Sequence, residues 1–271
     1  MLTDSQLEQY IRVARDATFA GSEFLKKHLQ HSYVLGKKSS AVDVVTWADG
    51  AVQEIVIAHI RKHFPHHNML AEENSREKES TEEYCWAIDP IDGTSAFSVG
   101  LPTYSISIAL LYKKQPIAGA LYLSLINDIV WAGKGKGAYR GKKKLSVSPA
   151  SSLIDSAVAF DPSYENRQAF IKNLAAPLAD RVRILPMIYS QATALSLIAL
   201  GILAGYIQCG SPHVWDAAAG KLLVEESGGI VTSFTGQPLD LFAINGYVAG
   251  TKTIHKALLS HLRSIKSNFP S

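Results

Sequence analysis

The first 65 residues carry the pattern of two amphipathic helices. Apolar residues recur there every three or four positions, the spacing that aligns one face of a helix. The first helix is predicted over residues 5–30 and the second over 48–64, where Pro65 ends it because proline cannot continue a helix. A polar stretch at 36–40 joins the two predicted helices.

From Met69 to about Val147 the pattern changes to short apolar runs rich in β-branched and aromatic residues. Turns containing Gly, Asn-Asp or Lys separate these runs, which is typical of a large, mostly antiparallel sheet. The predicted strands are NMLA, YCWAID, YSISIALLY, PIAGALYLS, DIVWAG, GAYR and KLSVS.

Beyond Val147, strand-like and helical runs alternate, which favours an α/β second half. The predicted strands are SAVAF, RVRIL and GYIQC, and the predicted helices cover 164–176, 192–203, 216–227 and 253–266. The run PASS at 149–152 is the predicted boundary. Residues 1–148 are therefore expected to hold the N-terminal helices and the large sheet, and residues 149–271 the α/β part.

The composition is that of a soluble globular chain. Its 271 residues are 47% hydrophobic and 19% charged, with a formal net charge of +3, which does not suit a disordered chain. The basic run at 134–144 is interleaved with Gly and is read as solvated hairpin tips, so no nucleic-acid partner is expected. Since no signal peptide or membrane-spanning run is apparent, we expect a cytoplasmic protein without a membrane partner. Cys85 and Cys209 lie in apolar stretches and are expected to be buried free thiols.

Four acidic residues adjoin apolar segments instead of polar faces. Glu72 follows NMLA, Asp89 and Asp92 follow YCWAI, and Asp216 lies in VWDAAAG. Each one alone is explained by a helix cap or a surface charge. If folding gathers them, each pair about 4 Å apart repels by about 4 kcal/mol at an effective dielectric of about 20, so the cluster must take up protons or cations. An all-oxygen ligand set suits Mg²⁺.

The stretch DPIDGT, residues 89–94, has a spacing of its own. Because a strand alternates its faces, Asp89 and Asp92 need a turn at Pro90 to reach the same side. That turn also frees the Ile91 carbonyl to act as a ligand. The sequence therefore predicts a cation site at this turn.

An anion site is predicted directly after it. Gly93 allows a phosphate to approach the backbone, and Thr94 begins a short helix whose free N–H groups favour an anion. A cation site beside an anion site is what metal-assisted phosphoryl transfer requires.

These motifs, DPIDGT with AEEN around Glu72 and WDAAAG around Asp216, resemble the inositol monophosphatase family within the Mg²⁺-dependent, lithium-sensitive sugar and nucleotide phosphatases. The resemblance also covers KSSAVDVVTWAD, GKGKGAYRGKKKLSVS, ALSLIALG and EESGGIVTSFTGQPLDL, and so extends over nearly the whole chain. It implies a phosphoric monoester hydrolase and a homodimer. The implied fold is a layered α/β/α/β/α sandwich of the inositol monophosphatase and fructose-1,6-bisphosphatase type.

The resemblance also implies a set of metal ligands. Glu72, Asp89 and the Ile91 carbonyl would hold a first Mg²⁺. Asp89, Asp92 and Asp216 would hold a second, and Glu72 would help to bind a weaker third ion. The implied cofactor is thus two to three Mg²⁺ ions per active site.

The implied catalytic residues are Thr94, Glu72 and Asp49. Thr94 resembles the family threonine that hydrogen-bonds the attacking water and is itself paired with an aspartate, here Asp49. The amides of Gly93 and Thr94 would hold the phosphate. Because paired cations stabilise both the attacking and the leaving oxygen, this mechanism needs no protein nucleophile.

Substrate choice is predicted to lie mainly in the second half. The predicted substrate contacts are Asp92, Ser190, Ala192, Thr193, Gln208 and Asp216. Family members that act on inositol phosphates usually carry an acidic residue near position 208, where this chain has Gln208. The run from Gln208 to Asp216 is also one residue longer here than in those members. The leading prediction is hydrolysis of a small polyol phosphate, inositol 1-phosphate first. The alternatives are a histidinol phosphatase, a 3′(2′),5′-bisphosphate nucleotidase, a fructose-1,6-bisphosphatase, or a non-enzymatic partner in a transcription complex.

Overall fold

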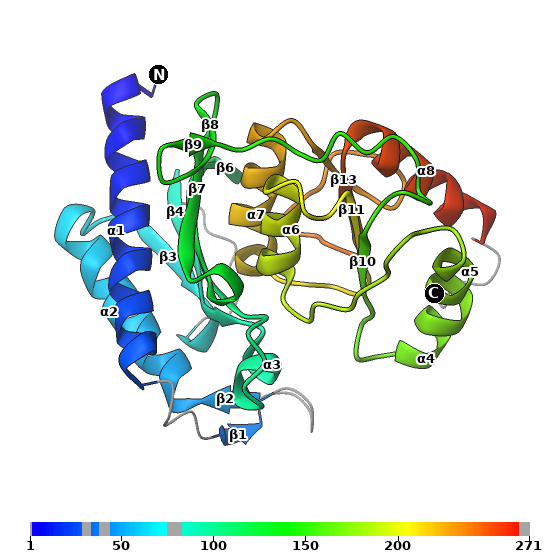
Figure 1. Ribbon diagram of the computed structural model, residues 1–271. Coiled ribbons are helices and arrows are strands. Elements are labelled where there is room, and N and C mark those ends of the chain that lie inside the picture. Colours follow the sequence, from blue (N-terminus) through cyan, green and yellow to red (C-terminus); the bar gives the residue numbers. More distant parts are fainter. Residues whose placement is uncertain (1, 29–33, 38–43, 75–82, 266–271) are drawn as a thin grey trace.

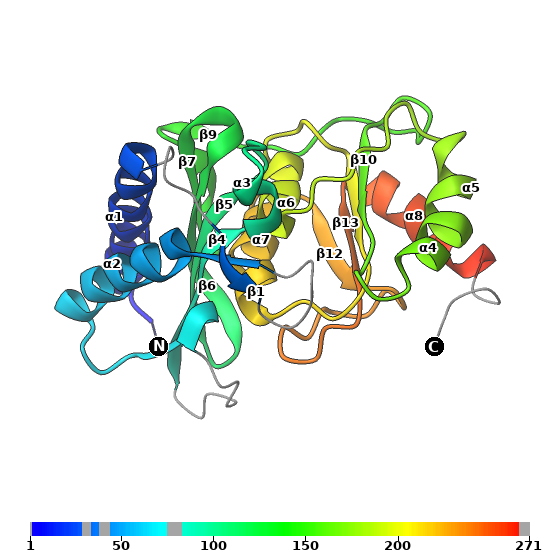
Figure 2. The ribbon, with the colours of Figure 1, turned by 90° about the horizontal axis from the view of Figure 1, so that it is seen from below.

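The structure is a computed structural model that describes residues 2–28, 34–37, 44–74 and 83–265. Helices, a sheet, helices, a second sheet and further helices follow one another across the molecule (Figure 1). The view from below shows the same order, with the N-terminal helices and α8 (Lys252–Ser264) at opposite ends (Figure 2). The predicted α/β/α/β/α sandwich is confirmed.

The first layer consists of α1 (Asp4–His28) and α2 (Trp47–His63), which cover one face of the large sheet (Figure 1). Both helices are where the apolar periodicity predicted them, although residues 29–30 of the first prediction lie outside the described residues. The short strands β1 (Val34–Lys37) and β2 (Val44–Thr46) pair antiparallel between them and were not predicted.

The large sheet has seven strands in the order β3-β4-β5-β6-β7-β8-β9. Only the β3–β4 pair is parallel among these neighbours, so the prediction of a mostly antiparallel sheet is confirmed. The strands are β3 (Asn68–Ala71), β4 (Tyr84–Asp92), β5 (Ser105–Tyr112), β6 (Gln115–Leu123), β7 (Asp128–Gly133), β8 (Gly137–Arg140) and β9 (Lys143–Lys144).

The middle layer holds α6 (Gln191–Ala199) and α7 (Val214–Glu226). Small residues let α7 lie close to its neighbours. A Cβ added to Gly119 of β6 would be 3.3 Å from Ala219, and one added to Gly220 would be 2.6 Å from Leu195 of α6. The AAAG run of α7 therefore allows a close approach on both sides.

The second sheet has four strands in the order β10-β11-β13-β12. The strands β10 and β11 are parallel and the other pairs antiparallel. The outer helical layer consists of α8 and a continuous helical segment whose middle turn is wider than an α-helix. The bounds are β10 (Val158–Asp161), β11 (Gly205–Gln208), β12 (Ile230–Ser233), β13 (Tyr247–Gly250), α4 (Arg167–Phe170), η4 (Ile171–Ala175) and α5 (Ala176–Ala179).

Two predicted strands are wrong in whole or in part. RVRIL runs beside β10 but forms just an isolated bridge between Ala157 and Ile184. The Phe160 N–H donates to the carbonyl of Pro186, which has no N–H to continue the ladder. In KLSVS the strand ends at Lys144.

The residues after β9 leave the sheet for the end of α7, because the Val147 N–H donates to the Ser227 carbonyl at 3.1 Å. The predicted boundary at 149–152 falls in this connection between the two sheets, and a division into domains stays a prediction.

The helix predicted over 192–203 is too long. It ends at Ala199, and Gly201 then adopts a left-handed φ of 74°. The Ile202 N–H donates to the Leu197 carbonyl at 2.9 Å, which closes the helix in the manner of a glycine C-cap.

Three clusters of buried apolar side chains fill the spaces between the layers. Cys85 and Cys209 are buried and free, as expected. None of the described helices combines the length and the apolar character needed to cross a membrane.

Candidate active site

The four acidic residues come together at one edge of the large sheet. Because β3 and β4 are parallel and Ala71 pairs with Ile88, Glu72, the first residue after β3, lies beside Asp89 of β4. Asp92 ends β4, and Asp216 lies in the first turn of α7. All four are close enough to interact electrostatically.

Burial and mutual repulsion raise the pKa values in this cluster. The pKa of Asp89 lies well above its usual range, first because the carboxyl is buried and then because Glu72, Asp92 and Asp216 are near. Burial also raises the pKa of Asp216, with Asp92 and Glu72 adding to the shift. Hydrogen bonds join Asp89 to Glu72 and to Asp216. The cluster is therefore unfavourable as a set of free anions.

The end of β4 bends where the sequence predicted a turn. The strand continues to Asp92, but its pairing with β5 is irregular between Asp89 and Asp92. The Ile91 N–H donates to Asp89 Oδ1 at 3.0 Å, which closes the backbone around Pro90. The predicted turn is thus a kink within the strand, and it places both carboxyls in the cluster.

Thr94 and Asp49 form the hydrogen bond that was expected of them. Thr94 Oγ1 is 3.1 Å from Asp49 Oδ1 and 2.9 Å from the Ile91 carbonyl. The other oxygen of Asp49 accepts from the N–H and the hydroxyl of Thr46, at 2.7 and 2.6 Å, in the capping box of α2. Since a hydroxyl has one proton and both Thr94 contacts are acceptors, its oxygen can still accept a hydrogen bond.

Gly93 lies between the acidic cluster and α3 (Thr94–Ser98). Its φ is 91°, and an added Cβ would be 2.8 Å from the Thr103 carbonyl, 3.0 Å from Ser190 Cβ and 3.1 Å from the Tyr189 carbonyl. Glycine is required here by both the conformation and the space. The backbone at 93–94 is thereby held against the segment that precedes α6.

The N-terminus of α6 holds the Asp92 carboxylate. The Ala192 N–H donates to Asp92 Oδ2 at 2.8 Å and the Gln191 N–H to Oδ1 at 3.2 Å, while the hydroxyls of Ser190 and Ser105 also donate to Oδ2. Burial raises the pKa of Asp92 to about 6, and these four hydrogen bonds oppose the shift. Ser190 and Ala192 therefore contact Asp92 directly.

Thr193 and Gln208, the other two predicted substrate residues of the second half, are buried and bonded within the protein. The Oγ1 of Thr193 lies 2.7 Å from Ser190 Oγ, so the two hydroxyls are within hydrogen-bond distance. Gln208 Oε1 accepts from the Tyr206 hydroxyl, and its Nε2 donates to the Cys209 carbonyl at 2.8 Å. The Gln208 amide is thus fixed by its own neighbourhood.

Asp161 was missed by the sequence analysis. It ends β10 opposite Gln208, and its Oδ1 accepts from the N–H groups of Ile188 and Tyr189 at 2.8 and 2.9 Å. Its Oδ2 lies 3.0 Å from the oxygen of the Tyr206 hydroxyl, which is also within hydrogen-bond distance of Gln208. The signal was present, because Asp161 follows the apolar run SAVAF just as Asp89 follows YCWAI.

The oxygen donors suit Mg²⁺ in kind. Carboxylates and a main-chain carbonyl are the hard ligands that this ion prefers, and a divalent cation would offset the repulsion that raises the pKa of Asp89 and Asp216. Within the described ranges, no three acidic, His or Cys side chains already surround one point as ligands.

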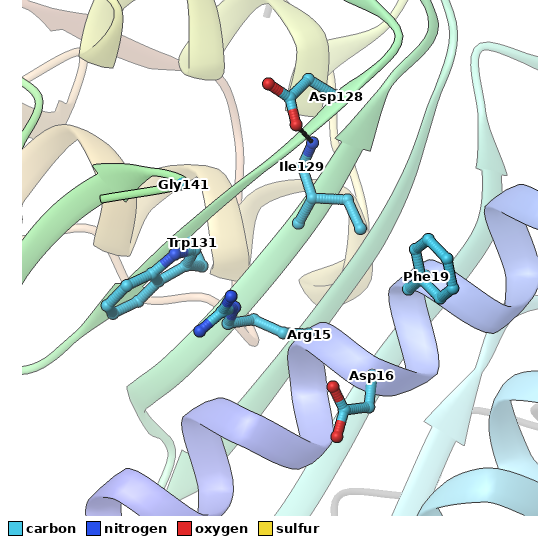
Figure 3. A pocket seen from close by; sticks show the side chains of 7 residues that line it. All are labelled: Arg15, Asp16, Phe19, Asp128, Ile129, Trp131 and Gly141. Carbon is cyan, nitrogen blue, oxygen red and sulfur yellow. Dashed lines mark hydrogen bonds between the residues drawn. The ribbon is translucent and has the colours of Figure 1, made fainter. Parts of the chain in front are cut away.

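A separate pocket of about 300 Å³ lies between α1 and β7 (Figure 3). The guanidinium of Arg15 lies over the ring of Trp131, 4.9 Å from its centroid. No member of the acidic cluster lines this pocket, which is therefore distinct from the candidate active site. Its lining residues are Arg15, Asp16, Phe19, Asp128, Ile129, Trp131 and Gly141.

Comparison with known proteins agrees with the fold and the motifs. The profile of the inositol monophosphatase family matches residues 6–267. Inositol monophosphatase 1 of Solanum lycopersicum is 30% identical over 89% of this chain and 90% of its own length. The fructose-1,6-bisphosphatase/inositol-1-monophosphatase of Aquifex aeolicus is 32% identical over 93% and 95%. The solved inositol monophosphatase of Anabaena superimposes with a TM-score of 0.83 at 30% identity, covering 96% of this chain and 97% of that one.

The layered fold, together with these similarities, defines a phosphatase, an enzyme that hydrolyses phosphoric monoesters. Within that class, the chain belongs to the inositol monophosphatase family.

Proposed function

We propose that this phosphatase is a Mg²⁺-dependent phosphomonoesterase that acts on a small polyol phosphate, inositol 1-phosphate first. The observation that carries the proposal is the cluster of Glu72, Asp89, Asp92 and Asp216 beside the Thr94 hydroxyl, in which Asp89 and Asp92 are buried and Glu72 and Asp216 are partly buried. The relatives named inositol monophosphatase support the choice of substrate.

In this proposal the acidic cluster holds two to three Mg²⁺ ions. Glu72, Asp89 and the Ile91 carbonyl are assigned to the first ion. Asp89, Asp92 and Asp216 are assigned to the second, and Glu72 also serves the third. When bound, these ions supply positive charge that activates the attacking water and stabilises the leaving oxygen.

The chain itself orients the reactants. Asp49 accepts a hydrogen bond from the Thr94 hydroxyl, so that the Thr94 oxygen can accept one from the attacking water. The amides of Gly93 and Thr94 donate to the phosphate, because the first N–H groups of a helix have no partner within it. Glu72 belongs to the catalytic set through its place beside Asp89.

Residues from the second half complete the substrate site in the proposal. Ser190, Ala192, Thr193 and Gln208 are assigned to it together with Asp92 and Asp216. Asp92 belongs to both parts of the site, since the N-terminus of α6 donates to its carboxylate and its charge repels that of Asp216 in the acidic cluster. We also propose that the enzyme is a cytoplasmic homodimer.

The test is phosphate release by the purified chain. With Mg²⁺, the wild type is expected to hydrolyse inositol 1-phosphate, lithium to inhibit it, and Asp92→Asn to abolish it. The exposed Asp155 provides a matched control, so Asp155→Asn should keep full activity. Phosphate release that persists both in EDTA and in Asp92→Asn would refute the proposal.

The second candidate is hydrolysis of fructose 1,6-bisphosphate. It is favoured by the Aquifex aeolicus relative, whose name includes this activity, at 32% identity. A panel of kcat/KM values that also includes histidinol phosphate and 3′(2′),5′-bisphosphate nucleotides ranks these substrates directly.

A further inference from the structure

One arginine and two tyrosines form a rim beside the acidic cluster. The guanidinium of Arg167 lies 4.8 Å from the ring centroid of Tyr164 and 5.9 Å from that of Tyr189. The tyrosines are 45% and 37% exposed, although large aromatic side chains are usually covered in a folded chain. We call Tyr164, Arg167 and Tyr189 the Arg167 rim.

The rim touches the candidate active site through Tyr164. The hydroxyl of Tyr164 donates to Ser95 Oγ at 3.3 Å. Ser95 follows Thr94 in α3. A group bound at the rim would therefore lie beside the backbone that is assigned to the reacting phosphate.

Tyr189 connects the rim to the other side of the site. It directly precedes Ser190, whose hydroxyl donates to Asp92. Its own φ of 57° is unusual for a residue other than glycine, and Asp161 fixes it by accepting the Tyr189 N–H at 2.9 Å. Asp161 thus fixes the backbone that carries the Tyr189 ring, directly before Ser190, the N-cap of α6.

The rim has a surplus of hydrogen-bond donors and of positive charge. Among the described residues, Arg167 makes no ion pair and its buried Nε has no hydrogen-bond partner. The Tyr189 hydroxyl donates to the Met187 sulfur at 3.3 Å, a weak acceptor that a better one would replace. An anion with several acceptor oxygens matches this set of donors.

We propose that the Arg167 rim binds a second phosphate group of the substrate while the first one reacts at the acidic cluster. This inference rests on the proposed function and adds sugar or polyol bisphosphates to its substrates. The planar, permanently charged guanidinium matches two phosphate oxygens at once, and the two tyrosine rings fix its orientation.

The test compares two substrates in Arg167→Gln. The ratio of kcat/KM for fructose 1,6-bisphosphate to that for inositol 1-phosphate is expected to fall about 10- to 100-fold, the range for a lost charge-assisted hydrogen bond. Arg167→Lys keeps the charge but loses the pair of N–H groups that can bind two phosphate oxygens, so its kcat/KM ratio should lie between those of the wild type and Arg167→Gln. Arg183→Gln is the matched control, because Arg183 is exposed and paired with Asp155, and should keep the wild-type ratio.

Equal losses for both substrates, or no loss for either, would overturn the inference. Binding of a non-hydrolysable bisphosphonate analogue separates this result from failure of the proposed function. The wild type should bind the bisphosphonate more tightly than the matching monophosphonate, and Arg167→Gln should lose this difference. That result supports the rim even if the wild type hydrolyses no ester. Hydrolysis of both esters with binding that does not depend on Arg167 refutes the rim and leaves the proposed function standing.

Discussion

Gly93→Ala tests how closely the chain packs around the candidate phosphate site. The added methyl group would approach the Thr103 and Tyr189 carbonyls to 2.8 and 3.1 Å, in a residue whose φ is 91°. Gly228 is the matched control, because its φ is 95° and an added Cβ would meet nothing within 4 Å. The pair separates backbone strain from close contact.

The structure sets the expected magnitudes. A left-handed φ costs an alanine about 1–2 kcal/mol, and this applies at both glycines. The contacts at Gly93 add about 1–3 kcal/mol, typical of overpacking, since two of the three nearest atoms are backbone oxygens that cannot rotate away. The entropy that alanine removes from the unfolded chain is the same in both variants and cancels.

Two assays measure the outcome. Gly93→Ala should melt below Gly228→Ala, by about 2–4 °C for each kcal/mol of difference. Its kcat for inositol 1-phosphate should fall about 100-fold, the usual effect of a displacement of about 1 Å in an active site, whereas Gly228→Ala should keep the wild-type kcat. If both variants show the same Tm and the same kcat, the close packing at Gly93 does not position the site.

Three further predictions follow from single residues. Asp161→Ala should lower the free energy of unfolding by about 1–3 kcal/mol in urea titrations, because the buried N–H of Ile188 loses its acceptor. Burial raises the pKa of Asp161 in the folded chain, so its contribution to stability is complete below its unfolded pKa and is lost as the pH rises through its folded pKa. Asp161→Asn should remove this dependence of stability on pH, and an unchanged dependence would contradict its origin in Asp161. Thr94→Ala should lower kcat about 100-fold or more with little change in KM, and Thr94→Ser should restore most of it; equal activities would exclude a role for the hydroxyl. Cys85 and Cys209 are buried, and burial raises the pKa of the Cys209 thiol, so neither should react with a disulfide reagent until the chain is denatured; rapid labelling of the native chain would be the contrary result.

Local sequence patterns predicted those helices and strands whose apolar residues repeat with a regular spacing. The amphipathic α1 and α2 and the strands β7 and β8 lie where apolar periodicity placed them. The acidic cluster was also predictable, because a carboxylate directly after an apolar strand has no local explanation once several occur together.

Local patterns could not predict contacts between segments that lie far apart in the sequence. RVRIL has the composition of a strand, yet Pro186 ends its pairing with β10. The strands β12 and β13 are four residues each and were not predicted. The bonds from Asp161 to Ile188 and Tyr189 span 27 and 28 positions, so no local pattern connects them.

The acidic cluster of Glu72, Asp89, Asp92 and Asp216 is proposed as a divalent-cation site, and calorimetric titration with Mg²⁺ tests this claim. Asp89 interacts with all three other acids, so Asp89→Asn removes the carboxylate assigned to both principal ions. The wild type and Asp155→Asn are expected to bind Mg²⁺ with the same affinity, and Asp89→Asn is expected to bind it at least about tenfold more weakly. Equal affinity in all three proteins would contradict the claim.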